Sequence, residues 1–225
     1  MRRSVAHALS EMYNTRPEIP KSRGPAVKKD ARPRAIGEWL VRPVIPVVWR
    51  TDADAALLAG ASLIFLQGCE LADLPGMLDW LKGGAAGRVP VVVHLDLLGG
   101  LASDEAGLRH LAGVGRIDGV ITVRPHLVEA ARRLGFAVIL LQFLQDGRAV
   151  ERGLHVVERS KPDAVELVPG AAAADVVRSF TKTSTPVIAG GLIRSPDLVR
   201  RLVEAGCAAV STSDPALWEL NRSAR

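Results

Sequence analysis

The segments PVIAGGLIRSPD (residues 186–197) and CAAVSTSDPALW (residues 207–218) decide the fold. Each joins a short apolar run to small and polar residues, and then to the start of a helix. In both, a proline occupies the first helical turn, at Pro196 and Pro215, where a missing backbone N–H is tolerated. The two segments therefore predict two consecutive strand and helix units of a parallel α/β protein.

The same unit recurs along the chain from residue 44 onward. Runs rich in Val, Ile and Leu each precede a polar turn and a stretch with helical spacing. The predicted strands are 44–48, 62–66, 90–95, 119–122, 136–141, 163–167, 186–189 and 207–211. Nearly continuous apolar strands indicate a parallel sheet covered on both faces, and eight such units predict a compact TIM-type (β/α)8 barrel. An open doubly wound sheet is the alternative, disfavoured because no GxGxxG follows the first strand.

The charge of the chain is concentrated at its N-terminus. The 225 residues carry a net charge of +5. Residues 1–35 hold nine basic and three acidic side chains, which leaves 20 basic and 21 acidic ones, a balance of −1, for residues 36–225. With four prolines and no sustained period, residues 1–35 are expected to form a disordered basic extension, and residues 36–225 the barrel domain.

Composition excludes several classes of protein. No uninterrupted apolar run reaches the roughly 18 residues of a membrane-spanning helix, and the N-terminus has no apolar stretch typical of a secretory signal. Cys69 and Cys207 are isolated, without metal-ligand spacing. We expect a soluble cytoplasmic protein without disulfides, metal, cofactor or membrane partner. Its oligomeric state is open, a homo-oligomer included.

The functional face of such a barrel is the C-terminal end of its strands. The predicted strands deliver mainly polar residues there: Arg50, His94, Asp96, Arg124, Glu166, Gly190, Gly191, Ser211, Thr212 and Ser213.

The last two strand ends favour a phosphate site. Loops after strands seven and eight of such barrels frequently bind phosphate through backbone N–H groups. Gly190 and Gly191 would let the backbone approach an anion, and Ser211, Thr212 and Ser213 would add donors. A simple strand-to-helix turn is the alternative for the two glycines alone.

His94 and Asp96 end the third predicted strand. Two residues apart on one strand, their side chains would point to the same side, where they could bind hydroxyls or form an acid and base pair. Alternatively, His94 is buried and bonded to backbone while Asp96 caps the following LLGG loop. Two ligands fall short of a metal site.

The ordered motifs resemble a known family. VVVHLDLLGGL, DGVITVRPHLVEAARRLG, SKPDAVELVPG and PVIAGGLIRSPDLVRRLVEAGCAAVSTSDPALWEL together resemble the glycerol uptake operon antiterminator regulatory proteins, over roughly residues 42–220. The resemblance implies a non-enzymatic regulator with a barrel fold that senses glycerol 3-phosphate and acts on leader mRNA, preventing premature transcription termination. It implies phosphate at residues 190, 191 and 211–213, hydroxyls near His94, Asp96 and Glu166, and a ligand role for Arg50 and Arg124.

One departure from the family pattern lies in the fifth strand. Family members typically read IQRxFLxD there, whereas this chain reads ILLQFLQD, so Leu140 and Leu141 replace a Gln-Arg pair while Asp146 remains. The replacement implies an altered ligand or a lost activity. RNA binding would depend on the basic residues 1–35, because the remainder of the chain is almost neutral.

A barrel enzyme acting on a phosphorylated substrate is the alternative function. It would be an isomerase or lyase with Asp96 or Glu166 as base and His94 as acid. Against it, no lysine lies at a predicted strand end, which removes Schiff-base chemistry.

Overall fold

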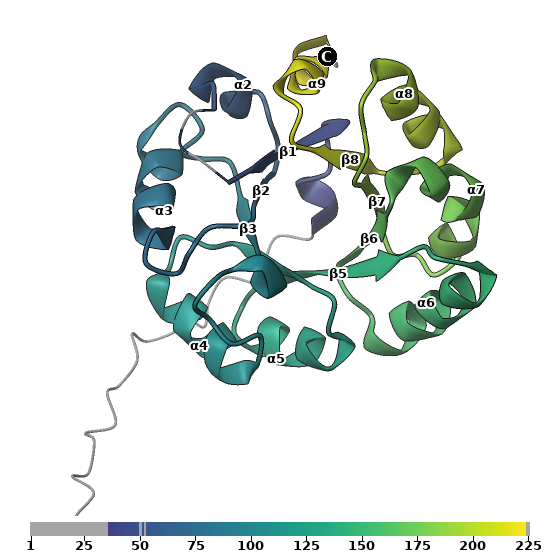
Figure 1. The fold of residues 1–225 in the computed structure, drawn as a ribbon, viewed down its shortest axis with the longest axis horizontal. Coiled ribbons are helices and arrows are strands. Elements are labelled where there is room, and N and C mark those ends of the chain that lie inside the picture. The colour runs from purple at the N-terminus through teal and green to yellow at the C-terminus, as the bar shows by residue number, and fades with distance from the viewer. Residues whose placement is uncertain (1–35, 50, 52, 224–225) are drawn as a thin grey trace, which may run out of the picture.

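The computed structural model describes residues 36–49, 51 and 53–223, so the predicted extension 1–35 and Arg50 lie outside the described residues. Eight parallel strands form one closed barrel with helices around its outside (Figure 1), which confirms the (β/α)8 prediction. Each strand pairs with its neighbours in sequence, and the last pairs with the first. The strands are β1 (Val44–Val48), β2 (Ile64–Leu66), β3 (Val91–His94), β4 (Gly119–Thr122), β5 (Ala137–Phe143), β6 (Ala164–Val168), β7 (Val187–Gly190) and β8 (Ala209–Thr212).

Helices cover the outer face of the barrel (Figure 1). The α-helices are α2 (Ala55–Ala59), α3 (Leu74–Gly83), α4 (Glu105–Val114), α5 (Val128–Arg133), α6 (Gly147–Ser160), α7 (Gly170–Thr181), α8 (Pro196–Ala205), α9 (Pro215–Trp218) and α10 (Leu220–Ser223); short 3-10 helices are η1 (Ile36–Glu38), η2 (Leu95–Leu97) and η3 (Pro125–Leu127). In the part of the chain that the structure describes, no helix combines the length and apolar character needed to cross a membrane.

Side-chain caps fix where several helices begin. Asp146 starts α6 by accepting a hydrogen bond from the amide of Ala149 at 2.7 Å. Ser195 does the same for α8, accepting from the amide of Leu198 at 3.2 Å. Such caps satisfy amides that the first helical turn leaves without a partner. Asp146, which this chain shares with the family pattern, therefore has a structural role at the start of α6.

The barrel has two apolar layers, because side chains on a strand alternate between its faces. One layer fills the space between strands and helices. The other fills the barrel interior, and includes Phe65, Ile139 and Ile188. Ile36 and Trp39, in and just after η1, join this inner layer, and Figure 1 shows η1 within the ring of strands. The residues that precede β1 therefore help to fill the barrel.

Five strands, β3 and β5 to β8, end one or two residues from the predicted end, and the differences at β3 and β5 bear on the site. β3 stops at His94, because Leu95 begins the 3-10 helix η2, so the prediction that His94 and Asp96 lie on one strand was wrong. β5 continues to Phe143, which pairs with Val168 of β6. The longer β5 brings Phe143 to the C-terminal mouth of the barrel.

Polar side chains hold the beginnings of several strands at the opposite, N-terminal face. Asp118 accepts a hydrogen bond from the amide of Val91 at 2.8 Å. The buried Asn221 binds both backbone groups of Val44, accepting from its amide at 3.1 Å and donating to its carbonyl at 2.9 Å. Asn221 thus ties the C-terminal helix to the first strand. This face contributes stability, whereas the opposite face is left for function.

The Asn221→Ala variant should therefore be less stable without losing ligand affinity. The substitution leaves the amide and carbonyl of Val44 buried without a partner, which costs about 2 to 4 kcal/mol of unfolding free energy. Denaturant unfolding measures this loss. The matched control is Asp54→Ala, which removes an exposed helix cap and should cost about 1 kcal/mol. A loss at Asn221 no larger than at Asp54 would contradict the role given to this tie.

Candidate ligand-binding site

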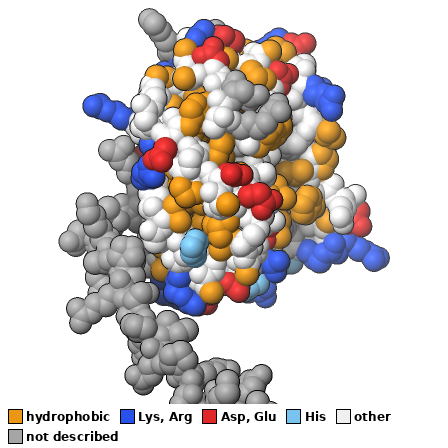
Figure 2. All heavy atoms as spheres, turned by 60° about the vertical axis from the view of Figure 1, so that its left-hand side comes forward, with side chains coloured by type: hydrophobic (Ala, Val, Ile, Leu, Met, Phe, Trp, Pro, Cys, Tyr) orange, Lys and Arg blue, Asp and Glu red, His pale blue; other side chains and the backbone are white. Residues whose placement is uncertain are grey.

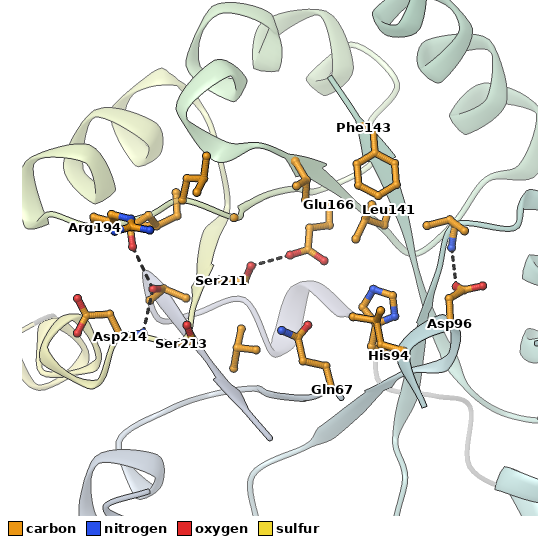
Figure 3. A pocket seen from close by; sticks show the side chains of 18 residues that line it. Gln67, His94, Asp96, Leu141, Phe143, Glu166, Arg194, Ser211, Ser213 and Asp214 are labelled. Carbon is orange, nitrogen blue, oxygen red and sulfur yellow. Dashed lines mark hydrogen bonds between the residues drawn. The ribbon is translucent and has the colours of Figure 1, made fainter. Parts of the chain in front are cut away.

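A pocket of about 910 Å³ opens at the C-terminal ends of the strands. It lies where the sequence places the functional face, and its size suits a small-molecule site. Figure 3 shows the side chains that line it. The predicted site residues among them are His94, Asp96, Glu166, Gly191, Ser211, Thr212 and Ser213. Gly190 lies next to these, and Arg124 lies outside the lining.

Glu166 and Ser211 meet at the base of the pocket. Ser211 Oγ donates a hydrogen bond to Glu166 Oε1 at 2.6 Å, and both side chains are buried. Burial raises the pKa of Glu166 to about 7, while the hydrogen bond from Ser211 opposes the shift. Near neutral pH the Glu166 carboxyl therefore exists both as a neutral O–H donor and as a carboxylate.

The two adjacent glycines have different roles. A Cβ atom on Gly190 would collide with Glu166 Oε1 and with Ser211 Oγ, so Gly190 makes room for the pair. Gly191 has φ +74°, which favours glycine. Its carbonyl accepts from the amide of Gly170 at 3.1 Å. A Gly191→Val variant would therefore strain the backbone as well as alter the pocket.

The loop after β7 presents backbone donors. Leu192 also has a positive φ, +58°, and the loop continues through Ile193 to Arg194 before α8 begins. Within the described ranges, the amides of residues 192–194 have no hydrogen-bond acceptor. Successive amides without partners at the rim of a pocket are an arrangement that binds anions.

Thr212 connects the loops after β7 and β8, and Ser213 lines the pocket. Thr212 Oγ1 donates to the carbonyl of Ile193 at 3.3 Å and accepts from the amide of Asp214 at 3.2 Å. The indole of Trp218 donates to the Thr212 carbonyl at 2.9 Å. Because Thr212 is engaged, the exposed Ser213 is the more available hydroxyl on this loop.

His94 has a buried nitrogen without a partner. The residue is only 5% exposed and lines the pocket, and Nδ1 contacts no hydrogen-bonding group in the described part of the chain. Burial lowers the pKa of His94, and the nearby Asp96 opposes this shift. The imidazole is therefore held mainly neutral, and a ligand hydroxyl could give Nδ1 its missing partner. For Nδ1, the alternative of a hydrogen bond to backbone is not observed among the described residues.

Asp96 is held by the end of β4. Its Oδ2 accepts from the amide of Val123 at 2.9 Å, and its Oδ1 accepts from Nε of Arg124 at 3.0 Å. Asp96 thus caps the β4 end and not the LLGG loop, and it still lines the pocket. Arg124 is half exposed and acts on the pocket through Asp96. Arg50 lies outside the described residues.

Sequence reasoning missed several residues that line the pocket. Arg194 is exposed and lies three residues after Gly191; among the described residues it forms no ion pair. Its place in the same segment as the two glycines was a signal for it. Gln67 of the loop after β2 also lines the pocket, as do Leu141 and Phe143 of β5. No motif pointed to Gln67.

The fold and the position of the pocket define a (β/α)8 barrel with a partly polar pocket at its C-terminal mouth. The glycerol-3-phosphate responsive antiterminator family matches residues 44–218, and the chain belongs to this family.

Solved structures of similar proteins agree with this assignment. The glycerol uptake operon antiterminator regulatory protein from Listeria monocytogenes is 28% identical, with a TM-score of 0.69, over 79% of this chain and 95% of that chain. A glycerol uptake operon antiterminator-related protein from Thermotoga maritima is 30% identical, with a TM-score of 0.69, over 79% of this chain and 98% of that one. The uncharacterised protein YgcP of Escherichia coli K12 is 32% identical over 128 residues, 57% of this chain and 67% of YgcP.

Enzymes share the fold at lower identity. Deoxyribose phosphate aldolase from Aeropyrum pernix is 15% identical, with a TM-score of 0.57, over 83% of this chain and 92% of that chain. At this identity the likeness concerns the barrel alone.

Replacing Glu166 by Gln should stabilise the protein at neutral and alkaline pH. The pKa of Glu166 is about 7 in the folded protein and about 4.5 in the unfolded chain. Between these two pH values the unfolded chain ionises Glu166 more readily, so the free energy of unfolding falls as pH rises from 4.5 to 7. Above pH 7 the wild type should be about 3 kcal/mol less stable than Glu166→Gln.

Unfolding of both proteins between pH 4 and pH 8 measures this difference, which should vanish near pH 4. Taking the difference between the two proteins removes the separate pH dependence of His94. A constant difference across this range would show that Glu166 keeps an ordinary pKa.

Proposed function

We propose that the protein senses glycerol 3-phosphate, or a similar small phosphate, in this pocket, and acts as an antiterminator on the leader mRNA of glycerol-utilisation genes. Membership of the glycerol-3-phosphate responsive family supports the effector. The structural observation that carries the proposal is the set of polar groups without partners at the two ends of one pocket.

The phosphate end lies at the loops after β7 and β8. The amides of residues 192–194 and the hydroxyl of Ser213 supply donors, and the Arg194 guanidinium supplies the positive charge. Figure 3 shows Arg194, Ser213 and Asp214 together on one side of the pocket. Asp214 is engaged as the cap of α9, accepting from the amide of Ala216 at 3.0 Å. This end combines backbone amides with a cation, which suits a phosphate group.

The hydroxyl end lies across the pocket. His94 Nδ1 needs a partner, and Glu166 can donate or accept according to its protonation. Figure 3 shows Gln67 beside His94, where its amide adds a donor and an acceptor. Arg124 neutralises Asp96, so Asp96 does not present an unpaired carboxylate to an anionic ligand. Hydroxyl groups of a polyol match this set.

Contact with RNA is assigned to the basic N-terminal residues. Residues 36–225 have a charge balance of −1, and Figure 2 shows Lys and Arg dispersed among Asp and Glu on the side of the barrel that carries α2 and α3. Affinity for a phosphate backbone requires clustered cations. Residues 1–35, with nine basic side chains against three acidic ones, have that charge.

Replacing Arg194 by Gln should weaken binding of glycerol 3-phosphate about 10-fold to 100-fold, because a charge-assisted hydrogen bond contributes about 1.5 to 3 kcal/mol. Isothermal titration calorimetry measures the affinity. Arg200→Gln is the matched control, because Arg200 lies on α8, the helix that follows Arg194, and pairs with Asp197 outside the pocket. Equal affinities of both variants would remove Arg194 from the site.

Replacing Lys28, Lys29, Arg32 and Arg34 by Gln should weaken binding to a leader RNA carrying a terminator hairpin. Each lost contact with a single-stranded phosphate should reduce the slope of log affinity against log salt concentration by about 0.7. Filter binding over a salt series measures both quantities. Affinity for glycerol 3-phosphate should stay unchanged in the same variant. An unaltered salt slope would move the RNA contact to the barrel.

An enzyme acting on a phosphorylated substrate is a second candidate, favoured by the raised pKa of Glu166 within the pocket. Against it, both oxygens of Asp96 are engaged, which leaves Glu166 as the available base. Among the described residues that line the pocket there is no lysine. Turnover of a sugar phosphate by the wild type, abolished in Glu166→Gln, would favour the enzyme.

A further inference from the structure

Half of the pocket is apolar, and the proposed effector does not explain it. Leu97, Val123, Leu141, Phe143 and Val168 line the side formed by β3 to β6. Leu97 is 51% exposed and Phe143 is 54% exposed. Single exposed apolar side chains are ordinary, but several that line one side of a polar pocket indicate an apolar part of a ligand.

Leu141 makes the side of the pocket next to β5 apolar. It points inward from β5, because side chains alternate along a strand and Ile139, two residues earlier, belongs to the inner layer. The family pattern has an arginine at this position. With Leu141, the described residues on the side of the pocket nearest β5 include no cation, and Phe143 extends the apolar surface toward the mouth.

The pocket is also larger than glycerol 3-phosphate requires. Its volume of about 910 Å³ lies near the upper end of the roughly 300–1,000 Å³ found for pockets that enclose drug-sized ligands. In the proposed arrangement, glycerol phosphate occupies the polar side between Arg194 and His94, and the space beside Leu141 and Phe143 is left for another group.

We propose that the natural ligand is a polyol phosphate with an apolar substituent on the carbon farthest from the phosphate, and that this substituent packs against Leu97, Leu141 and Phe143. The proposal rests on the proposed function, because it takes the phosphate to bind at the loops after β7 and β8. Figure 3 shows Leu141 and Phe143 on the side of Glu166 opposite to Arg194 and Ser213. An alkyl ether or ester at the hydroxyl end would therefore reach the apolar side while the phosphate stays in place.

The experiment compares three compounds by calorimetry with the full chain: glycerol 3-phosphate, 1-O-butylglycerol 3-phosphate and butyl phosphate. Burial of each methylene tightens binding roughly fourfold before ordering costs are subtracted, so the butyl ether should bind about 10-fold to 100-fold more tightly than glycerol 3-phosphate. Butyl phosphate lacks the hydroxyls that His94 would bind, and should bind more weakly than the butyl ether.

Two variants locate the substituent. Phe143→Ser and Leu97→Ser replace half-exposed side chains, so both proteins should fold, and both should lose most of the advantage of the butyl ether. Val203→Ser is the matched control, because Val203 is 40% exposed on α8 and does not line the pocket. Leu141→Arg, which restores the residue of the family pattern, should also remove the advantage while glycerol 3-phosphate still binds.

The outcomes separate the two proposals. Equal affinity for glycerol 3-phosphate and the butyl ether would overturn the apolar substituent and leave the proposed function standing. No binding of either compound would overturn both, and binding of the butyl ether alone would support the substituent and replace the effector. Light scattering on wild type and Phe143→Ser tests a different occupant: a dimer that Phe143→Ser dissociates would show that a second copy covers the apolar side, and would overturn the proposal.

Discussion

The pairing of β8 with β1 is the constraint on which the other features of the molecule depend. It joins Val44 to Val210 and Pro46 to Thr212, and converts a row of strands into a closed ring. Without it, the loops after β7 and β8 would lie at the edge of an open sheet, far from β3. With it, the C-terminal ends of all the strands face one mouth. Asn221 secures the same junction at the opposite face by binding Val44.

Closure of the barrel buries ionisable groups at the mouth, and each buried group lowers the stability of the folded protein. Glu166 is buried with Ser211 as its hydrogen-bond partner, and His94 Nδ1 has no partner among the described residues. A core selected only for stability would replace both by apolar side chains. Gly190 leaves room for Glu166 and Ser211, so the backbone itself is adapted to the pair. A bound ligand can offset this loss of stability by supplying the missing hydrogen-bond partners.

The pocket has features that support the proposed sensor over an enzyme. Two of the acidic groups that line it are engaged: Asp96 by Arg124 and Val123, and Asp214 by the start of α9, whereas Glu166 is held by the Ser211 hydroxyl. Groups held in this way orient a ligand and have little freedom to move protons. The family assignment points in the same direction, and the aldolase neighbour shares the barrel alone. The apolar side next to Leu141 distinguishes this chain from the family pattern, and the apolar substituent that we propose for the ligand rests on this difference.

Short-range pattern in the sequence was enough to determine the eight strands, the helix starts at Pro196 and Pro215, and the mouth as the place of the site. Strands and helix starts depend on residues close together in the chain, which is why Pro196 and Pro215 occupy the first turns of α8 and α9 as predicted. Only the tertiary structure decided which strand-end residues share the pocket. It assigned Arg124 to Asp96, engaged Thr212 between two loops, and brought Arg194, Gln67 and Leu141 into the lining. Those outcomes depend on where strands end and on contacts between residues far apart in sequence, and the end of β3 at His94 shows how one residue changes the direction in which a side chain points.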